Sequence, residues 1–417
     1  MTTQPVNRSS LFVITSLLFI LICLFGISTT EFTDKYCWEI WGIYIFYHGL
    51  PNAYNSGTNY MPLVQYLLYA YGKLAGSASV IEQQVGILKI FGLLFDFLGI
   101  WYVYKYLNKV VPFIELLLIN ILNLAFIYNS VIWGQFDAVL AAFNFIAVYY
   151  ALKGKMTMSA VFFMLAFNMK VQAVVLLPVI GIFYLWNIAD KKTWKSIVYP
   201  LLSMVVVQLV FLLPFLDNTE QLDMIFNVVV GSVDNHPAVS LNAYNIWHLL
   251  IRSGDPFYIH DSTVFLAGIS YKTVGLALFF LTSFVALFPL LKNLALKLAG
   301  KPVNAIENHK LLLICALLYL LFFYFNTQMH ERYSHPAFLF IIAYAFYKRK
   351  FLIYTLFSLV YFLSLERVMQ WLSLKNYNTA IFDTRVLALV YGFIIVYMFY
   401  LLYRREVVLM KKAATIE

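Results

Sequence analysis

Long apolar stretches recur from one end of the chain to the other, and they constrain the fold more than any other feature. A helix that crosses a bilayer needs about 20 mostly apolar residues. Such helices are expected over residues 10–27, 84–104, 111–131, 136–152, 156–170, 171–188, 196–216, 273–291, 311–328, 333–347, 351–365 and 385–403. The sequence therefore predicts an all-α polytopic membrane protein with about twelve transmembrane helices, of which 156–170, 333–347 and 351–365 are short.

Composition excludes the two other broad classes of chain. Only 12% of the residues are charged, about half of the roughly 25% that is typical of a soluble globular domain. A soluble protein of this size would need much more polar surface. The hydrophobic share of 62% also excludes intrinsic disorder, because disordered chains are poor in apolar residues.

Basic residues predict how the helices are oriented. With a cytoplasmic N-terminus and twelve crossings, most of the 29 lysines and arginines fall in inner loops, often in tight clusters such as Lys348, Arg349 and Lys350. This distribution is the positive-inside pattern, which sets the orientation of membrane proteins. The N- and C-termini are therefore expected on the cytoplasmic side, and the net charge of +9 needs no nucleic-acid partner.

Two outer loops are long, over residues 28–83 and 217–272. The first contains amphipathic stretches rich in Trp and Tyr, over residues 36–47 and 62–74. Aromatic amphipathic segments of this kind lie along the membrane interface. No internal repeat is visible, which counts against a transporter built from inverted repeats.

Polar and ionisable residues gather on the predicted outer side. They are Asp34, Tyr60, Trp133, Gln135, Asp137, Lys170, Gln172, Asn242, His330 and Arg332. Ionisable groups at the edge of a membrane are candidates for function because burying them is costly. A transporter would concentrate them near the midplane, whereas an enzyme that works at the outer edge of the bilayer would place them as seen.

Several of these residues also have simpler explanations. Asp34 and Asp137 could each cap a helix, and Lys170 could extend from a short span to the headgroups. Arg332 could pair with Glu331 or anchor to lipid phosphate.

Metal and nucleotide chemistry have little support in the sequence. No paired histidine or cysteine motif with metal-ligand spacing appears, and Glu31 with Asp34 offers only a weak site for a divalent cation. No phosphate-binding glycine loop is present either. We therefore expect no cofactor and no soluble nucleotide donor.

The order of several motifs resembles a known family. In chain order they are an early outer-loop acid (Asp34), Trp41…His48-Gly49…Tyr54, Tyr60-x-Pro62, Trp133-Gly-Gln-x-Asp137, Lys170-x-Gln172 with a downstream Pro178, Asn242-Ala-x-Asn-x-Trp247 and His330-Glu-Arg332-Tyr333. Over about residues 10–340 this set resembles the GT-C superfamily of integral membrane glycosyltransferases. It is most similar to prokaryotic members that use polyprenyl-phosphate sugars, relatives of the dolichyl-phosphate-glucose-dependent glucosyltransferases.

Two motifs depart from the eukaryotic enzymes of that family. Those enzymes carry a His-Phe-Gln-Tyr-Asn type motif and a His-Glu-Lys motif, where this chain has Trp133-Gly-Gln-Phe-Asp137 and His330-Glu-Arg332. The general chemistry is expected to be shared, but transfer onto a dolichol-linked oligosaccharide is not.

The resemblance implies a GT-C-like bundle with amphipathic helices in the first outer loop. Residues 1–272 would form the catalytic membrane module, including the loops 28–83 and 217–272, and residues 273–417 would add transmembrane helices without a soluble domain. It further implies a prokaryotic cell membrane and an extracytoplasmic active site. A hexose would pass from a polyprenyl-phosphate donor to a glycan, lipid or protein acceptor, with inversion at the anomeric carbon.

The residue types suit this chemistry. An attacking hydroxyl must lose its proton, and Asp34 is the expected general base. The departing phosphate needs fixed cations, which Arg332 and Lys170 would supply, with a hydrogen bond from His330. The expected sugar or acceptor ligands are Gln135, Asp137, Gln172, Asn242, Tyr60 and Trp133.

Two other classes remain open at this stage. A polysaccharide polymerase or ligase would also use lipid-linked donors but would release a pyrophosphate, and it would be expected to cluster several outer arginines. A lipid-linked-sugar flippase or transporter would line the membrane midplane with ionisable residues, and only Lys89 and Asp96 lie at such positions.

Overall fold

The computed structural model describes residues 8–28, 34–108, 110–232, 236–303 and 306–404. The α-helices are α1 (Arg8–Ser28), α2 (Lys35–His48), α3 (Pro62–Ala75), α4 (Ala78–Gln83), α5 (Lys89–Tyr106), α6 (Phe113–Ile121), α7 (Leu124–Tyr128), α8 (Asp137–Leu152), α9 (Met156–Met169), α10 (Leu177–Lys191), α11 (Trp194–Leu212), α12 (Thr219–Gly231), α13 (Trp247–Leu250), α14 (Tyr271–Leu298), α15 (Asn308–Phe325), α16 (Ala337–Lys348), α17 (Leu352–Met369) and α18 (Thr384–Tyr403). The shorter elements are η1 (Leu50–Ser56), η2 (Val85–Leu88), η3 (Asn129–Trp133), η4 (Val171–Leu176), η5 (Leu213–Phe215), η6 (Pro256–Tyr258) and η7 (Ala380–Phe382). The strands β1 (Val264–Leu266) and β2 (Ile269–Ser270) form an antiparallel hairpin.

Membrane-spanning character is clear in the described part of the chain. Eight of its helical segments are long and apolar enough to cross a bilayer, and each coincides with a stretch expected from the sequence. They are α1, η2 with α5, η4 with α10, α11 with η5, α14, α15, α17 and α18. The expectation of a short span at 351–365 is wrong, because α17 continues to Met369 and has 18 residues.

Three further apolar helices are shorter than a full crossing. They are α8, α9 and α16, and they too lie where spans were expected. Helices of this length need neighbouring protein or a thinned bilayer to complete a crossing. The chain is therefore a nearly all-α, multi-pass membrane protein, and the total of about twelve crossings stays a prediction.

The segment 111–131 differs from the single span that was expected. It consists of α6 followed by α7 and η3, and the two parts meet at an angle of 67°. Asn123 lies at the bend, where its side-chain oxygen accepts a hydrogen bond from the backbone of Ala125 and so caps α7. Its amide nitrogen donates to the hydroxyls of Tyr354 and Ser358 on α17. A capping residue in an apolar run thus starts a new helix instead of continuing the old one.

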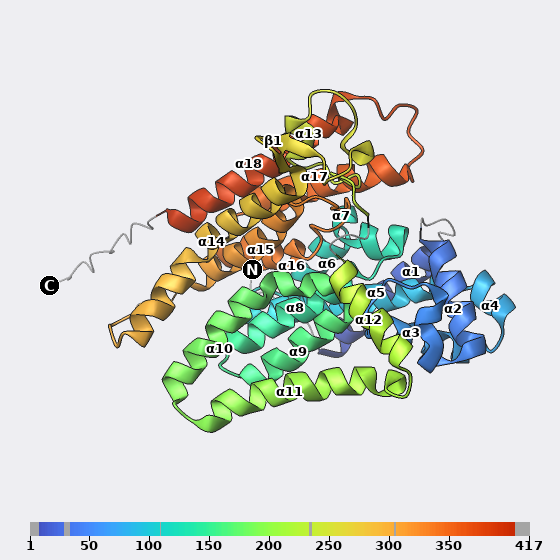
Figure 1. The fold of residues 1–417 in the computed structure, drawn as a ribbon, viewed down its shortest axis with the longest axis horizontal. Coiled ribbons are helices and arrows are strands. Elements are labelled where there is room, and N and C mark those ends of the chain that lie inside the picture. Colours follow the sequence, from blue (N-terminus) through green and yellow to red (C-terminus); the bar gives the residue numbers. More distant parts are fainter. Residues whose placement is uncertain (1–7, 29–33, 109, 233–235, 304–305, 405–417) are drawn as a thin grey trace.

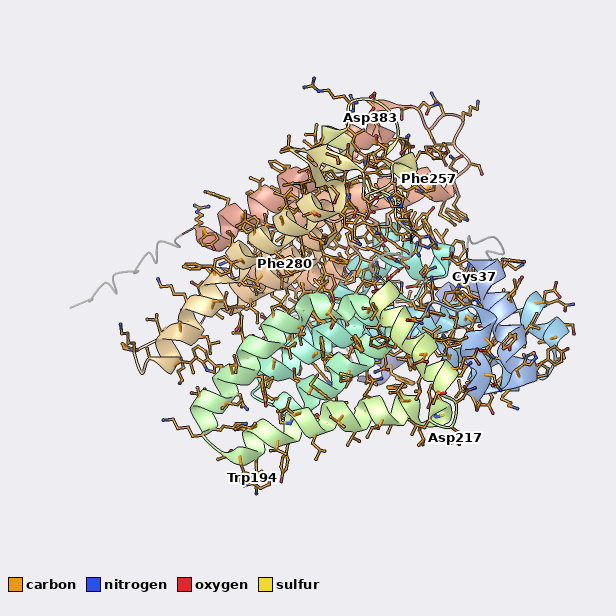
Figure 2. The ribbon with its side chains drawn as sticks, in the orientation of Figure 1. Cys37, Trp194, Asp217, Phe257, Phe280 and Asp383 are labelled. Atoms are coloured by element: carbon orange, nitrogen blue, oxygen red, sulfur yellow. The ribbon has the colours of Figure 1, made fainter. Side chains whose placement is uncertain are left out.

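The core lies around three helices that are buried on almost all sides: α8, α15 and α16. Helices that are apolar all round belong inside a bundle. By contrast, only 6% of the apolar window of α1 and 17% of that of α11 are buried. Figure 2 shows side chains filling the bundle, while Trp194 of α11 and Phe280 of α14 are mostly exposed, as expected of surfaces that face lipid.

The two long loops contain their own short helices. The first holds α2, η1, α3 and α4, and the second holds α12, α13, η6 and the β-hairpin. Figure 1 shows α2, α3 and α4 together at one end of the molecule, with the α10–α11 turn at the opposite end. That turn carries the basic residues Lys191, Lys192 and Lys195.

Candidate functional site

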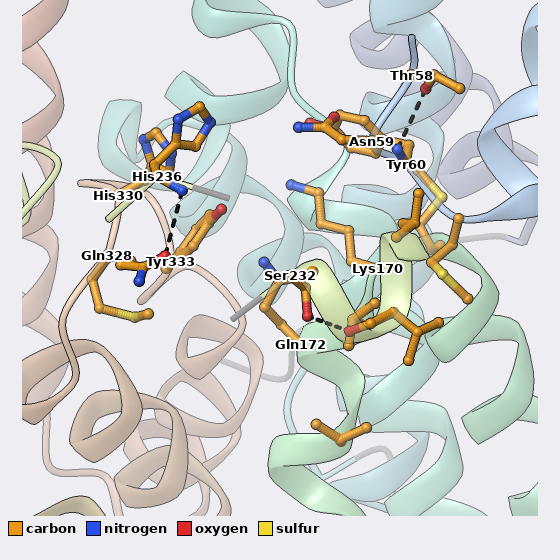
Figure 3. Close-up of a pocket in the computed structure, with 18 of the residues that line it drawn as sticks. Thr58, Asn59, Tyr60, Lys170, Gln172, Ser232, His236, Gln328, His330 and Tyr333 are labelled. Atoms are coloured by element: carbon orange, nitrogen blue, oxygen red, sulfur yellow. Dashed lines mark hydrogen bonds between the residues drawn. The ribbon is translucent and has the colours of Figure 1, made fainter. Parts of the chain in front are cut away.

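A cavity of about 900 Å³ lies where the two long loops meet the helix bundle. Its walls come from α2, the turn before α3, the α9–η4 junction, α12, α14 and the segment between α15 and α16. Figure 3 shows that Thr58, Asn59 and Tyr60 lie on one side of it and His236, Gln328 and His330 on the other, with Lys170 between them. Segments more than 250 residues apart in the chain, such as Asp34 and Arg332, therefore share one cavity.

Asp34 lines the cavity at the start of α2. It occupies the N-cap position, but its side chain accepts no capping hydrogen bond from the helix backbone. Its Oδ2 atom is buried and has no hydrogen-bond partner among the described residues. A capping role, the simpler interpretation of this residue, is thus absent from the described geometry, and the side chain is 31% exposed at the cavity.

Arg332 lies next to Asp34 and is held by Glu331. Its Nη1 donates to Glu331 Oε1 at 2.8 Å, and its Nη2 lies 3.9 Å from Asp34 Oδ2. The pairing with Glu331 that the sequence allowed is therefore present. It uses only part of the guanidinium, since the buried Nε has no hydrogen-bond partner among the described residues. Arginine carries five N–H donors, so the side chain keeps donors for an anion.

One carboxylate, that of Asp137, connects the two cations of the site. Lys170 Nζ lies 2.5 Å from Asp137 Oδ1, and Arg332 Nε lies 3.6 Å from Asp137 Oδ2. Lys170 reaches this position because α9 ends at Met169 and the backbone of Lys170 is extended before η4 begins. The spacing of Lys170 and Arg332 is thus set by a buried acid at the first residue of α8.

Asp137 is supported in turn by a chain of buried polar groups. Asn129 Nδ2 donates to Asp137 Oδ2 at 3.0 Å and lies 3.1 Å from the hydroxyl of Tyr361. That hydroxyl is also 3.1 Å from Nδ1 of His335. Buried polar groups in such a network fix one another's orientation, so Asp137 has little freedom to move.

Electrostatics keep the turn before α16 charged. Burial opposes the charge of Arg332, but the carboxylates of Glu331, Asp34 and Asp137 raise its pKa well above the usual range. Burial would raise the pKa of Glu331, yet the neighbouring His330 and the charge of Arg332 hold this pKa below its ordinary value. The ion pair therefore persists at any pH near neutrality.

His330 also lines the cavity. Burial lowers the pKa of its imidazole despite the neighbouring Glu331, so the ring is neutral near pH 7 and offers a hydrogen bond rather than a charge. Its ring centroid lies 5.9 Å from that of His236. Asn242 pairs with the backbone of His330 through a β-bridge and has a φ of 61°. Asn242 does not line the cavity, so its contribution in this geometry is to hold the segment that carries His330.

The remaining expected ligands divide into two groups. Tyr60 and Gln172 line the cavity, whereas Trp133, Gln135 and Asp137 lie behind its wall. Gln135 accepts a 2.9 Å hydrogen bond from the hydroxyl of Tyr60, and the ring of Trp133 lies 5.6 Å from the guanidinium carbon of Arg332. These three support cavity residues, and in the described geometry they reach no cavity surface.

Sequence reasoning did not single out Trp38, and it named Trp41 only within the motif order of the family resemblance, with no role assigned. Both line the cavity, together with Cys37. Trp38 and Trp41 follow Asp34 by four and seven residues, and this spacing places Asp34, Trp38 and Trp41 on one face of α2. That spacing was the available signal. Asn129 and His335 gave no comparable signal, because each lies far in sequence from the acid that it helps to support.

No group of three or more metal-ligating side chains occurs in the part of the chain that the structure describes. The weak cation site suggested by Glu31 and Asp34 cannot be assessed as a pair, since Glu31 lies outside the described residues. Asp34 faces Arg332 instead.

One part of the cavity is apolar. It is lined by Met169, Val171, Val174, Met224, Val228, Leu276, Phe279 and Phe322. Val174 and Leu276 belong to two membrane-spanning segments and are 41% and 36% exposed. The cavity thus brings the charged groups together with side chains of two segments that are long and apolar enough to cross a bilayer.

No protein-family model matches this chain, and no curated protein matches it.

Proposed function

We propose that this protein is an inverting, GT-C-type glycosyltransferase that moves a hexose from a polyprenyl-phosphate donor to an acceptor at the outer edge of the membrane. One observation carries the proposal. Asp34, Lys170 and Arg332, from three distant parts of the chain, line a single cavity that is charged in one part and apolar in another. A donor with a phosphate head and a prenyl tail needs both parts.

The proposed reaction is a direct displacement. The acceptor hydroxyl attacks the anomeric carbon and forms the new glycosidic bond, while the bond from that carbon to the phosphate oxygen breaks. Asp34 takes the hydroxyl proton. Lys170 and Arg332 stabilise the charge that develops on the departing polyprenyl phosphate. His330 donates a hydrogen bond to the same phosphate, and no metal ion is required for this balance.

The free donors of the site support this assignment. Arg332 donates a side-chain hydrogen bond to Glu331, and its buried Nε, 3.6 Å from Asp137 Oδ2, has no hydrogen-bond partner among the described residues. A buried donor of that kind costs free energy unless a ligand uses it. A phosphate beside Arg332 and Lys170 would satisfy it, and it would also weaken the hold of Arg332 on Asp34.

The proposed orientation is an outward active site with both termini in the cytoplasm. The basic turn at Lys191 and Lys192 lies at the end of the molecule opposite α2, α3 and α4 (Figure 1). Basic loops favour the cytoplasmic side, so the end with α2 would face outward. We propose a prokaryotic cell membrane as the setting, on the resemblance of the motifs alone.

The direct test uses the purified protein in lipid nanodiscs. It would receive a radiolabelled polyprenyl-phosphate hexose and a mixture of soluble saccharides, and the products would be separated and their anomeric configuration determined by NMR. We expect a new glycosidic bond of inverted configuration and release of polyprenyl phosphate.

Two results would contradict the proposal and indicate another class of protein. Turnover of a polyprenyl-pyrophosphate donor alone would indicate a polymerase or ligase. In proteoliposomes, movement of the labelled donor across the bilayer with no new glycosidic bond would indicate a flippase.

A matched control for the transfer assay is Lys192→Gln in the α10–α11 turn. This residue lies away from the cavity, so the substitution should leave transfer unchanged.

A further inference from the structure

An aromatic wall stands directly beside Asp34. Trp38 and Trp41 on α2 and Tyr60 before α3 line the cavity. The ring centroids of Trp38 and Trp41 lie 5.5 Å apart, and that of Tyr60 lies 5.1 Å from Trp38 and 5.8 Å from Trp41. Trp38 is fully buried, whereas Trp41 and Tyr60 are half-buried. The ring planes are inclined to one another, by 60° between Trp41 and Tyr60, 54° between Trp38 and Tyr60 and 86° between Trp38 and Trp41. The surface offered to the cavity is thus an angled one, formed by the rings of Trp41 and Tyr60 and backed by Trp38.

The wall is rigid before any ligand arrives. The hydroxyl of Tyr60 donates to Gln135, and the carbonyl of Tyr60 accepts from Tyr54 at 3.1 Å and from Gln65 at 3.2 Å. Gln65 also donates to Thr58 at 3.1 Å. Behind the wall, Trp38 packs against Phe136 with ring centroids 4.7 Å apart. Rings held in this way lose little conformational entropy when they bind a ligand.

The wall and the proposed base are fixed relative to each other. Trp38 and Trp41 lie one and two turns after Asp34 on the same face of α2. Lys170 closes the other side, with Nζ 5.4 Å from the centroid of the Tyr60 ring. A ligand that packs against the aromatic wall therefore lies in the same cavity as Asp34 and beside Lys170.

We propose that this wall binds a pyranose ring of the acceptor, so that the acceptor is a carbohydrate; this inference rests on the proposed function. A pyranose has an apolar C–H face that packs on aromatic rings and hydroxyls at its edge. The wall offers the matching arrangement, with rings on one side and Asp34, Thr58 and Asn59 around them. A lipid acceptor would instead be expected among the apolar side chains of the cavity, and a serine or threonine hydroxyl needs no surface of aromatic rings.

The experiment compares three acceptor classes and three variants. Protein in nanodiscs with a polyprenyl-phosphate hexose would receive p-nitrophenyl hexosides, a serine-containing peptide or diacylglycerol. Trp41→Ala should raise KM for the hexosides about tenfold, the scale of one lost aromatic contact, and leave KM for the donor unchanged. Trp41→Phe should restore most of the loss. Tyr36→Ala, an exposed position on the same helix that does not line the cavity, should behave as wild type.

Two outcomes would overturn the inference. In the first, the protein transfers the hexose to the peptide or to diacylglycerol but not to the hexosides. In the second, Trp41→Ala changes KM for the donor alone. If no donor is turned over, even to water, the proposed function fails instead. The wall would then be judged by saturation-transfer NMR with methyl hexosides in the absence of donor. Signal that is present in wild type and lost in Trp41→Ala supports the wall, and absence of signal in wild type refutes it.

Discussion

Two buried clusters of charged residues in this protein differ in how completely they are satisfied. The site cluster consists of Asp34, Asp137, Lys170, Glu331 and Arg332. The loop cluster consists of Glu366 and Arg367 at the end of α17 with their partners Tyr128 and Tyr377.

In the loop cluster, Glu366 accepts hydrogen bonds from Tyr128 at 2.6 Å, from Tyr377 at 2.5 Å and from the backbone of Leu372 at 2.8 Å. Arg367 donates to the carbonyls of Tyr377 and Phe382.

The site cluster is incompletely satisfied by comparison. Asp34 Oδ2 and Arg332 Nε have no hydrogen-bond partner among the described residues, and the contacts from Arg332 to Asp34 and Asp137 are 3.9 Å and 3.6 Å long. Native proteins rarely leave buried polar atoms unpaired, and each such atom calls for an explanation. We infer that the loop cluster stabilises the α17–α18 connection, whereas the site cluster keeps polar atoms for a ligand.

The largest expected effect is that of Asp34→Asn. Removing a general base typically costs between about 100-fold and 10,000-fold in rate, and asparagine keeps the size of the side chain. Transfer assays should show this loss in kcat, while thermal unfolding and donor binding stay close to wild type. Transfer at a near-normal rate would show that the base lies elsewhere.

Next in size is Arg332→Gln. Loss of one electrostatic contact to the departing group costs about 100-fold in rate or more, so kcat/KM for the donor should fall by that factor. Since Glu331 loses its partner, thermal unfolding must be measured alongside. Arg332→Lys keeps the positive charge but not the bidentate geometry of the guanidinium. This variant should fold and show an intermediate loss in kcat/KM for the donor. If Arg332→Lys folds and transfers like wild type, the guanidinium does not bind phosphate.

A smaller effect is expected for Asp137→Asn. The amide keeps a hydrogen-bond acceptor for Lys170 but removes the charge that holds Lys170 and Arg332 together. We expect KM for the donor to rise about tenfold, equivalent to ~1.4 kcal/mol, with a smaller change in kcat. A direct role in binding the acceptor would instead raise the acceptor KM alone, and that result would refute a positioning role.

The smallest effect on transfer is expected for Glu366→Gln in the loop cluster. Its three hydrogen-bond donors lose a charged acceptor, which should lower stability by about 1–3 kcal/mol and lower the melting temperature. The activity of the folded fraction should equal wild type. If the rate of transfer fell sharply while the melting temperature stayed unchanged, the loop cluster would contribute to the site, and the distinction between the two clusters would be wrong.

The sequence predicted much of the fold, because apolar runs of about 20 residues admit few structures in a bilayer. It did not predict the bend at Asn123, since a single capping residue inside an apolar run gives no periodic signal. Asp34, Lys170 and Arg332 were identified because burying an ionisable group at the edge of a membrane costs free energy. The structure places these three residues around one cavity. The supporting positions of Asp137, Gln135 and Asn242 were not predictable, because whether a polar side chain faces a cavity or its wall depends on packing between distant helices. Their assigned roles stay predictions.

A structure of the protein in nanodiscs with a non-hydrolysable polyprenyl-phosphonate hexose bound would test the proposed donor site. We expect the phosphonate between Arg332 and Lys170, the anomeric carbon facing Asp34, and the prenyl chain along Val174 and Leu276. A phosphonate bound at the basic α10–α11 turn, with Arg332 still paired to Asp34 and Glu331, would contradict the proposed site.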